Sequence, residues 1–259
     1  MIGFFAAGLI APFFFEASPE VRSTYVSLGR IVEDRPMQVT FTRVGVDAGA
    51  FGRFGIRNWD VSSLTDRRHD AHRHALYHTE FGPTWQYDLD IADDWRLKSD
   101  LTRSWTMYRG FAEGSDNKTY HWWQLGQSLE NPYLVPFWRF RRTFRGSDYF
   151  YFKAGVRRKV DVWDALSLTP SVFAEGGNAR NQLRVLGRRP GDGHWDAGAA
   201  SVSCRLEAAW RFCENVSAFA FVEQYEIVGG NERRAVRASS YRCAHNDWTL
   251  AGVGIRLKF

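Results

Sequence analysis

Charged residues recur at alternate positions in several segments of this 259-residue sequence. Alternate side chains of an extended strand share one face, so each such segment would present a row of charges on one side. Rows of this kind line aqueous pores or form networks of ion pairs inside a protein. The positions concerned are Glu80, Asp88, Arg139, Arg141, Lys153, Arg157, Lys159, Glu175, Arg205, Glu207 and Arg211.

The densest of these rows is basic and spans two neighbouring segments, with members Arg139, Arg141, Lys153, Arg157 and Lys159. Like charges at this spacing repel one another unless a negative group lies opposite them. An anionic solute, a lipopolysaccharide phosphate, or carboxylates of the same wall such as Glu130 and Glu175 would supply that negative charge. Around enclosed water, a basic lining favours anions, whereas pairing with carboxylates would make the row a structural network.

A group of histidines has spacings that could surround a transition metal, with members His69, Asp70, His72, His74 and His78. Arginines are interspersed among them, at positions 67, 68 and 73, and their charge disfavours a bound cation. Most of this stretch has the composition of an external loop, and only His78 falls on an expected strand. The sequence therefore predicts no metal site and no cofactor.

Serine-based catalysis would need a nucleophile, a histidine base and a group that orients the histidine. Ser128, His121 and Glu130 are the candidates, but no nucleophile motif surrounds them. His121 and Ser128 also have opposite parity on the same expected strand, which places them on opposite faces. We therefore predict no catalytic residues and a protein that is not an enzyme.

The elements that carry these residues are predicted to be long β-strands, because a period of two dominates from about residue 20 onward. Ser201 to Phe212 shows it best, with apolar residues at even positions and mostly polar ones between them. Such segments are about 11 to 15 residues long, whereas strands of soluble proteins cluster near 5 to 6 and membrane-spanning strands need about 9 to 11. After residue 15 no apolar run approaches the roughly 20 residues of a spanning helix.

Twelve strands are expected, near 22–30, 36–46, 51–60, 76–91, 95–109, 119–130, 133–144, 148–162, 166–180, 198–212, 216–229 and 246–259. The connections between them alternate between short turns, such as 92–94 and 213–215, and mostly longer polar loops, such as 61–75 and 230–245. This alternation is typical of an antiparallel, up-and-down transmembrane β-barrel. Leu206, Trp210, Phe152, Val156, Trp85 and Ile255 are expected to face outward.

Three prolines lie on the expected outward face inside strands, at Pro83, Pro136 and Pro170. Proline cannot donate a ladder hydrogen bond, so bulges or strand ends are expected there.

Residues 2–15 form the only long apolar run of the chain. The run is too short to span a bilayer as a helix and is similar to the apolar core of a signal peptide, although no basic residue precedes it. It is either the remnant of a signal or an apolar segment packed on the barrel. The expected division is therefore residues 1–20 for this segment and 21–259 for one barrel domain.

Composition excludes two other classes. The formal net charge is +5, but lysines and arginines gather on no single face, and the aromatic residues alternate with apolar ones instead of lining a basic groove. A nucleic-acid partner is therefore not expected. Three cysteines leave at least one unpaired and have no metal-type spacing, which excludes a disulfide scaffold.

The last strand, which ends WTLAGVGIRLKF, alternates to a terminal Phe259 and resembles the closing strand of Gram-negative outer-membrane β-barrels. Residues 24–30 (TYVSLGR) resemble, more weakly, the opening strand of small porin-like proteins. The resemblance covers residues 22–259 and implies an integral outer-membrane protein inserted by the barrel-assembly machinery through its last strand. It further implies contact with outer-membrane lipid and lipopolysaccharide.

Two functions follow as expectations from the charged inner face and the resemblance together. One is a porin-like channel for passive passage of small polar or anionic solutes. The other is a non-conducting structural or adhesive barrel whose lumen is filled by ion pairs.

Overall fold

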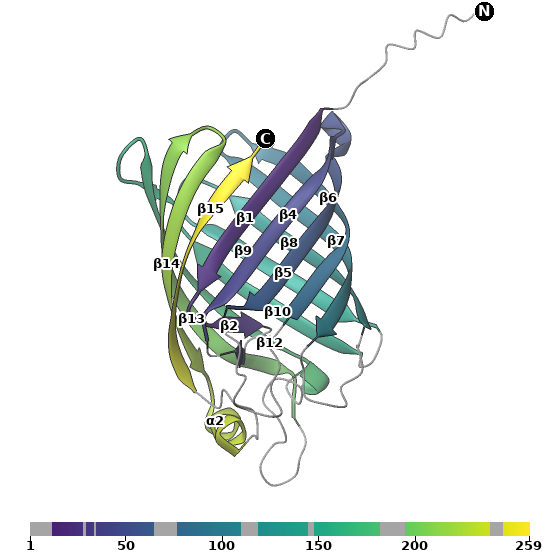
Figure 1. The fold of residues 1–259 in the computed structure, drawn as a ribbon, viewed down its shortest axis with the longest axis vertical. Helices are drawn as coiled ribbons and strands as arrows, with labels where there is room; N and C mark the ends of the chain where they lie inside the picture. The colour runs from purple at the N-terminus through teal and green to yellow at the C-terminus, as the bar shows by residue number, and fades with distance from the viewer. Residues whose placement is uncertain are drawn as a thin grey trace, which may run out of the picture.

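The computed structural model describes residues 12–27, 30–33, 35–64, 77–109, 119–144, 148–181, 195–238 and 246–259. Twelve long antiparallel strands pair in sequence around a closed ring (Figure 1). The ring is formed by β1 (Phe13–Arg22), β4 (Met37–Asp47), β5 (Arg53–Ser63), β6 (Tyr77–Ala92), β7 (Trp95–Arg109), β8 (Thr119–Glu130), β9 (Val135–Thr143), β10 (Tyr149–Arg157), β12 (Leu166–Gly177), β13 (Gly198–Cys213), β14 (Val216–Ile227) and β15 (Asp247–Lys258).

Shorter elements lie at the two ends of the ring. The hairpin of β2 (Tyr25–Ser27) and β3 (Arg30–Glu33) follows β1, and the two-residue strand β11 (Val160–Asp161) continues β10. A 3-10 turn, η1 (Gly49–Phe51), links β4 to β5, and the helix α2 (Gly230–Ala238) follows β14. We call the end with the short connections the turn end, and the opposite end, which carries α2, the loop end (Figure 1).

The ring closes between β1 and β15, in the register Ala17 opposite Leu257 and Val21 opposite Val253. The first strand of the ring was expected near 22–30, but the strand that pairs with β15 is β1, so that expectation is wrong. The barrel wall begins at Phe13, so the boundary expected at residue 20 is also too late. The alternation of β1 was hidden because Phe14, on its inner face, is as apolar as Phe13 and Phe15 on its outer face.

The outer face of the ring is apolar, as the alternation predicted. Leu206, Trp210 and Ile255 each leave about 45% of their surface exposed, and Phe152, Val156 and Trp85 are partly exposed. Apolar surface on this scale is abnormal for a soluble monomer and is typical of a lipid-facing wall. Among the described residues, no helix is long and apolar enough to cross a membrane.

The three prolines sit where the strand ladders are interrupted or end. No register pair joins Pro83 to β7, because the pairing passes from Phe81 to Thr84. Pro136 lies just beyond the last pair between β8 and β9, and Pro170 lies just beyond the last pair between β10 and β12. The N–H group that each proline lacks would therefore lie at a position where the ladder on that side forms no pair.

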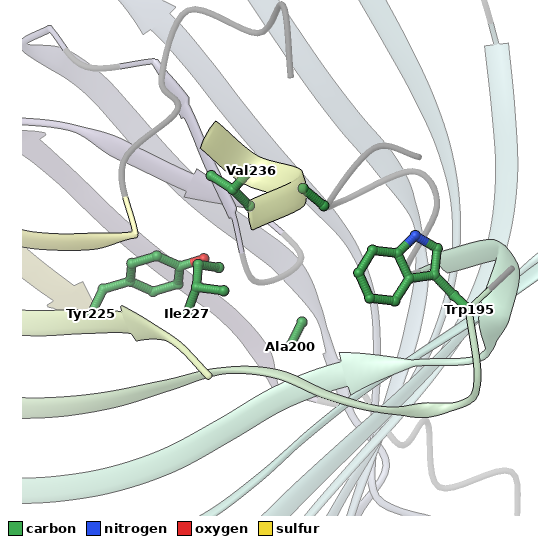
Figure 2. Packing of buried hydrophobic residues seen from close by; sticks show 6 residues of the cluster. Trp195, Ala200, Tyr225, Ile227 and Val236 are labelled. Carbon is green, nitrogen blue, oxygen red and sulfur yellow. The ribbon is translucent and has the colours of Figure 1, made fainter. Parts of the chain in front are cut away.

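The loop end contains a helix where the sequence led us to expect a polar loop over 230–245. Four of the nine residues of α2 are charged, but the helix also carries Ala235 and Val236, which are buried. They pack against Tyr225 and Ile227 at the end of β14, together with Trp195 and Ala200 (Figure 2). Two apolar residues in a stretch rich in arginine are too few for a helical period to be recognised from sequence alone.

Candidate functional site: the barrel lumen

The most deeply buried charges of the lumen surround Glu80 on β6, which is 4% exposed. Its carboxylate lies 3.1 Å from Arg141 on β9 and 3.4 Å from Arg57 on β5. Arg141 reaches it from three strands away, because β7 contributes only small residues, Ser104 and Thr106, at this level. Both guanidinium groups thus share one carboxylate.

The indole ring of Trp122 packs against both guanidinium groups of this cluster. The carbon of the Arg141 guanidinium lies 3.9 Å from the ring centre of Trp122, and that of Arg57 lies 5.1 Å from it. The Trp122 N–H donates to the Thr106 hydroxyl at 2.7 Å, and Gln124 accepts from Arg141 at 3.2 Å. Cation–π stacking and the hydrogen bonds of Arg141 and Trp122 fix these side chains in one arrangement, although the buried Arg57 Nε has no hydrogen-bond partner among the described residues. Sequence reasoning missed Trp122, because an inward tryptophan does not stand out among eleven.

The basic row on β9 and β10 is largely paired with carboxylates. Lys153 lies 2.9 Å from Glu175 on β12 and only 3.4 Å from the ring centre of Phe173. Arg157 lies 2.7 Å from Glu130 on β8. For Lys153 and Arg157, the negative charge opposite the basic row is therefore supplied by carboxylates of the wall itself.

A second network lies on β13 to β15. Glu207 pairs with Arg205 at 2.8 Å and with Arg256 at 2.7 Å. The two guanidinium groups cover inward-facing aromatic rings, Arg205 over Phe221 at 3.6 Å and Arg256 over Phe219 at 4.1 Å. The rings themselves occupy space left by the inward glycines of β15, since a Cβ on Gly252 or Gly254 would come within 2.7 Å of one of them.

Toward the turn end the lumen is open to water. Lys159 and Asp161 pair at 2.7 Å but are both more than 60% exposed. A cavity of about 580 Å³ opens here, lined by Arg211, Arg256 and Lys258 as well as by this pair. Arg211 donates to the backbone oxygen of Asp164 at 2.6 Å, so its charge is not neutralised by that contact.

Some inward charges have no salt-bridge partner in the described part of the chain. Arg139 is exposed, lies between the levels of Arg141 and the turn end, and has no such partner. Arg211 and Lys258 share this property. Asp88 is an exposed carboxylate without a salt bridge, and its register partner on β7 is a lysine, Lys98. Among the inward-facing strand residues of the open lumen, the charges without a salt bridge are therefore mainly basic, whereas the turn residues Asp164 and Glu214 add two exposed carboxylates to the lining of the same cavity.

The loop end of the lumen is packed with apolar side chains instead. Met37 and Val39 have the inward parity of Arg43 on β4, and Val61 has that of Arg57 on β5; all three aliphatic residues are fully buried. Their strand neighbours of opposite parity, such as Gln38 and Asp60, are polar and face outward. Sequence reasoning assigned the apolar face to lipid throughout, which is wrong for this part of β4 and β5.

Two charged lumen residues, Glu16 and Glu20, were missed because β1 was not recognised. Glu16 pairs closely with Arg43, and Glu20 pairs closely with Arg22. Arg43 also lies 3.5 Å from Asp100 on β7, which accepts hydrogen bonds from the hydroxyls of Thr84 and Thr102. The signal was present as Glu and Arg at even positions of 16–22, next to an apolar run that concealed it.

The candidates for other chemistry do not converge. The Ser128 hydroxyl donates to Glu130 at 2.7 Å, but His121 stacks edge-on against Trp105 on the outer face. No group of three metal-ligating residues occurs among the described residues. His78 lies 3.2 Å from Glu80, whereas the other histidines of the group lie outside the described residues, as does Cys243. Cys204 and Cys213 are free and exposed.

No family model and no curated protein matches the sequence. Among solved structures, the NanC porin matches with a TM-score of 0.51 at 9% identity, over 95% of this chain and 100% of that chain. The chain has the fold of an outer-membrane porin barrel. The KdgM porin gives a TM-score of 0.48 at 10% identity, over 95% and 99% of the two chains. The translocator domain of the autotransporter NalP from Neisseria meningitidis gives 0.47 at 11% identity, over 95% and 88%.

Proposed function

We propose that this chain is an outer-membrane channel through which small polar solutes pass, anions in preference to cations. One observation carries the proposal: inward-facing strand positions of the open lumen hold basic side chains that form no salt bridge with any described residue. Arg139, Arg211 and Lys258 are its members. A positive, water-filled lining lowers the electrostatic cost of anion entry and raises that of cation entry.

Placement in a membrane is supported by the wall itself. Its outer face exposes large apolar residues on most strands, and its closed hydrogen-bonding leaves no strand edge to be satisfied by water. Insertion through the barrel-assembly machinery, with β15 as the recognised strand, belongs to the same proposal. No catalytic role is part of it.

The test is the zero-current potential of single channels in planar bilayers under a KCl gradient. Wild-type protein is expected to conduct and to favour chloride. The variant Arg139→Gln should shift the potential toward cation preference, most clearly at low salt, because the Debye length shrinks from about 10 Å at 0.1 M to about 3 Å at 1 M. Arg158→Gln is the matched control. Arg158 directly follows β10, the strand that pairs with β9, and has the parity of the outward-facing residues.

The paired residues are weaker test sites than their number suggests. Removing Arg157 or Lys159 also releases a carboxylate, Glu130 or Asp161, so such variants change two charges at once. Arg139 has no carboxylate to release. A conducting wild type that favours cations would overturn the proposed selectivity.

A second candidate is a barrel that does not conduct. The packed loop end favours it, because Met37, Val39 and Val61 leave no water-exposed surface on their part of the inner wall. Correctly folded protein that inserts into bilayers without measurable conductance would establish this alternative and overturn the channel.

A further inference from the structure

The outer face carries two arginines in one row. The burial of the residues next to each arginine in its strand fixes the direction in which the arginine points. Thr102 and Ser104 are completely buried inside β7, so Arg103 faces outward and is exposed. By the same alternation Arg142 on β9 faces outward, since Thr143 is completely buried.

Pairing registers place both arginines around one tryptophan. Arg103 lies opposite Trp123 on β8, and Trp123 lies opposite Arg142. Neighbouring strands are about 4.8 Å apart, so the two arginines stand about 10 Å apart along the wall. Phe150 on β10 extends the row beyond Arg142.

Aromatic rings hold each guanidinium in place. That of Arg103 lies 5.3 Å from the ring of Trp105 and 5.6 Å from that of Trp123. That of Arg142 lies 5.1 Å from Phe144 and 5.2 Å from Phe150. Such stacking orients the planar fork. The N–H groups of Arg142 donate to Asp148, whereas those of Arg103 have no acceptor among the described residues and remain available to an anion.

The charges of the row are not balanced. Arg142 lies 3.3 Å from the exposed Asp148, but Arg103 has no carboxylate partner among the described residues. An arginine on a lipid-facing wall is costly unless it reaches the interface or an anion. The row lies toward the loop end, since Arg142 is the penultimate residue of β9 and the 110–118 loop precedes β8.

We infer that this row is a binding site for a phosphorylated lipid of the outer leaflet. Phosphate oxygens match the arginine fork, and the exposed surfaces of Trp123 and Phe140 offer apolar contact for the acyl chains. Free phosphate would use only the first of these contacts, so the proposal commits to the lipid. It depends on membrane placement but not on whether the lumen conducts.

The experiment is native mass spectrometry of the purified full chain in detergent, titrated with lipid A that carries two phosphates. Arg103→Gln should weaken retention of this lipid by about tenfold, because one charge-assisted contact is lost. Arg103→Gln combined with Arg142→Gln should weaken it further. Arg158→Gln, which removes an exposed arginine of outward parity at the turn end, should leave it unchanged.

Three results would overturn the inference. The first is equal retention by wild type and the double variant. The second is displacement of the lipid by an equal concentration of inorganic phosphate, which would indicate a simple anion site. The third is equally tight retention of phosphatidylglycerol, which would indicate attraction to any anionic lipid. The mobility shift of unheated samples in SDS gels verifies that each variant is folded, and conductance of the same samples reports separately on the channel.

Discussion

Met37 and Arg43 lie on the same face of β4, yet they meet opposite surroundings. Arg43, nearer the turn end, pairs with Glu16 on the neighbouring strand β1, whereas Met37, at the loop end, is buried in an aliphatic cluster with Val39 and Val61. The outer face changes in the opposite sense, from Val44, which is half exposed, to the polar Gln38. The same contrast occurs on β14, where Phe221 lies under Arg205 but Ile227 lies under α2.

This contrast indicates that the wall of the barrel meets two solvents, lipid along one part of its height and water along another. Where lipid surrounds the wall, apolar residues face outward and charged ones face the lumen. Where water surrounds it, the hydrophobic effect drives apolar residues inward, as in a soluble barrel. The level at which the faces exchange therefore marks where the wall leaves the bilayer. On β4 that level lies between Val44 and Gln38.

The largest effect is expected from breaking the buried cluster of the mid-lumen. Glu80→Ala would leave Arg57 and Arg141 without their carboxylate, which should lower the free energy of unfolding by about 3–5 kcal/mol. Asp161→Ala, in the exposed pair at the turn end, should lower it by less than about 1 kcal/mol. Urea unfolding in detergent or lipid vesicles measures both. Similar losses in the two variants would show that Glu80 is as well hydrated as Asp161.

A second change tests the apolar end of the same lumen. Ile227→Ala removes a side chain that is 1% exposed, and a cost of about 2–5 kcal/mol is expected for the cluster under α2. Because this cluster lies beyond the lipid-facing part, the loss should be local: faster amide exchange in α2 and a higher single-channel conductance. Val222→Ala, on the outer face of the same strand, should change neither. Faster exchange throughout β14 in Ile227→Ala would contradict a separate loop-end core.

The parity rule located eleven of the twelve ring strands, because alternation depends on the pleat and not on which face meets lipid. Alternation could not show which face is turned toward the lumen at the loop end, since a wall in lipid and a wall in water produce the same period. The first strand failed for a different reason: Phe13, Phe14 and Phe15 erase the period where β1 begins. Ion partners such as Glu80 and Arg141 lie 61 positions apart, a contact that depends on the size of Ser104 and Thr106 between them.

The smallest effect is expected from a single added methyl group. Gly252→Ala would place a Cβ 2.5 Å from the ring of Phe221 and 2.9 Å from the backbone oxygen of Val21, so a cost of about 1–3 kcal/mol is expected. Gly198→Ala, where the added Cβ meets nothing within 4 Å, is the control and should be nearly neutral. Equal unfolding midpoints for the two variants would mean that the rings of the charged region shift freely.

The pairing of β1 with β15 also has a consequence in time. Phe15 and Phe259 exchange two backbone hydrogen bonds, of 2.7 and 2.8 Å, although almost the whole chain separates them. Every other neighbour in the ring follows in sequence order, apart from short inserted elements. The first strand gains its second neighbour only when the last strand has folded beside it, and until then one edge of β1 is open to pairing with other chains. Closing the ring is therefore the pairing step with the largest cost in chain entropy, and the edge of β1 needs protection from other chains until that step is complete.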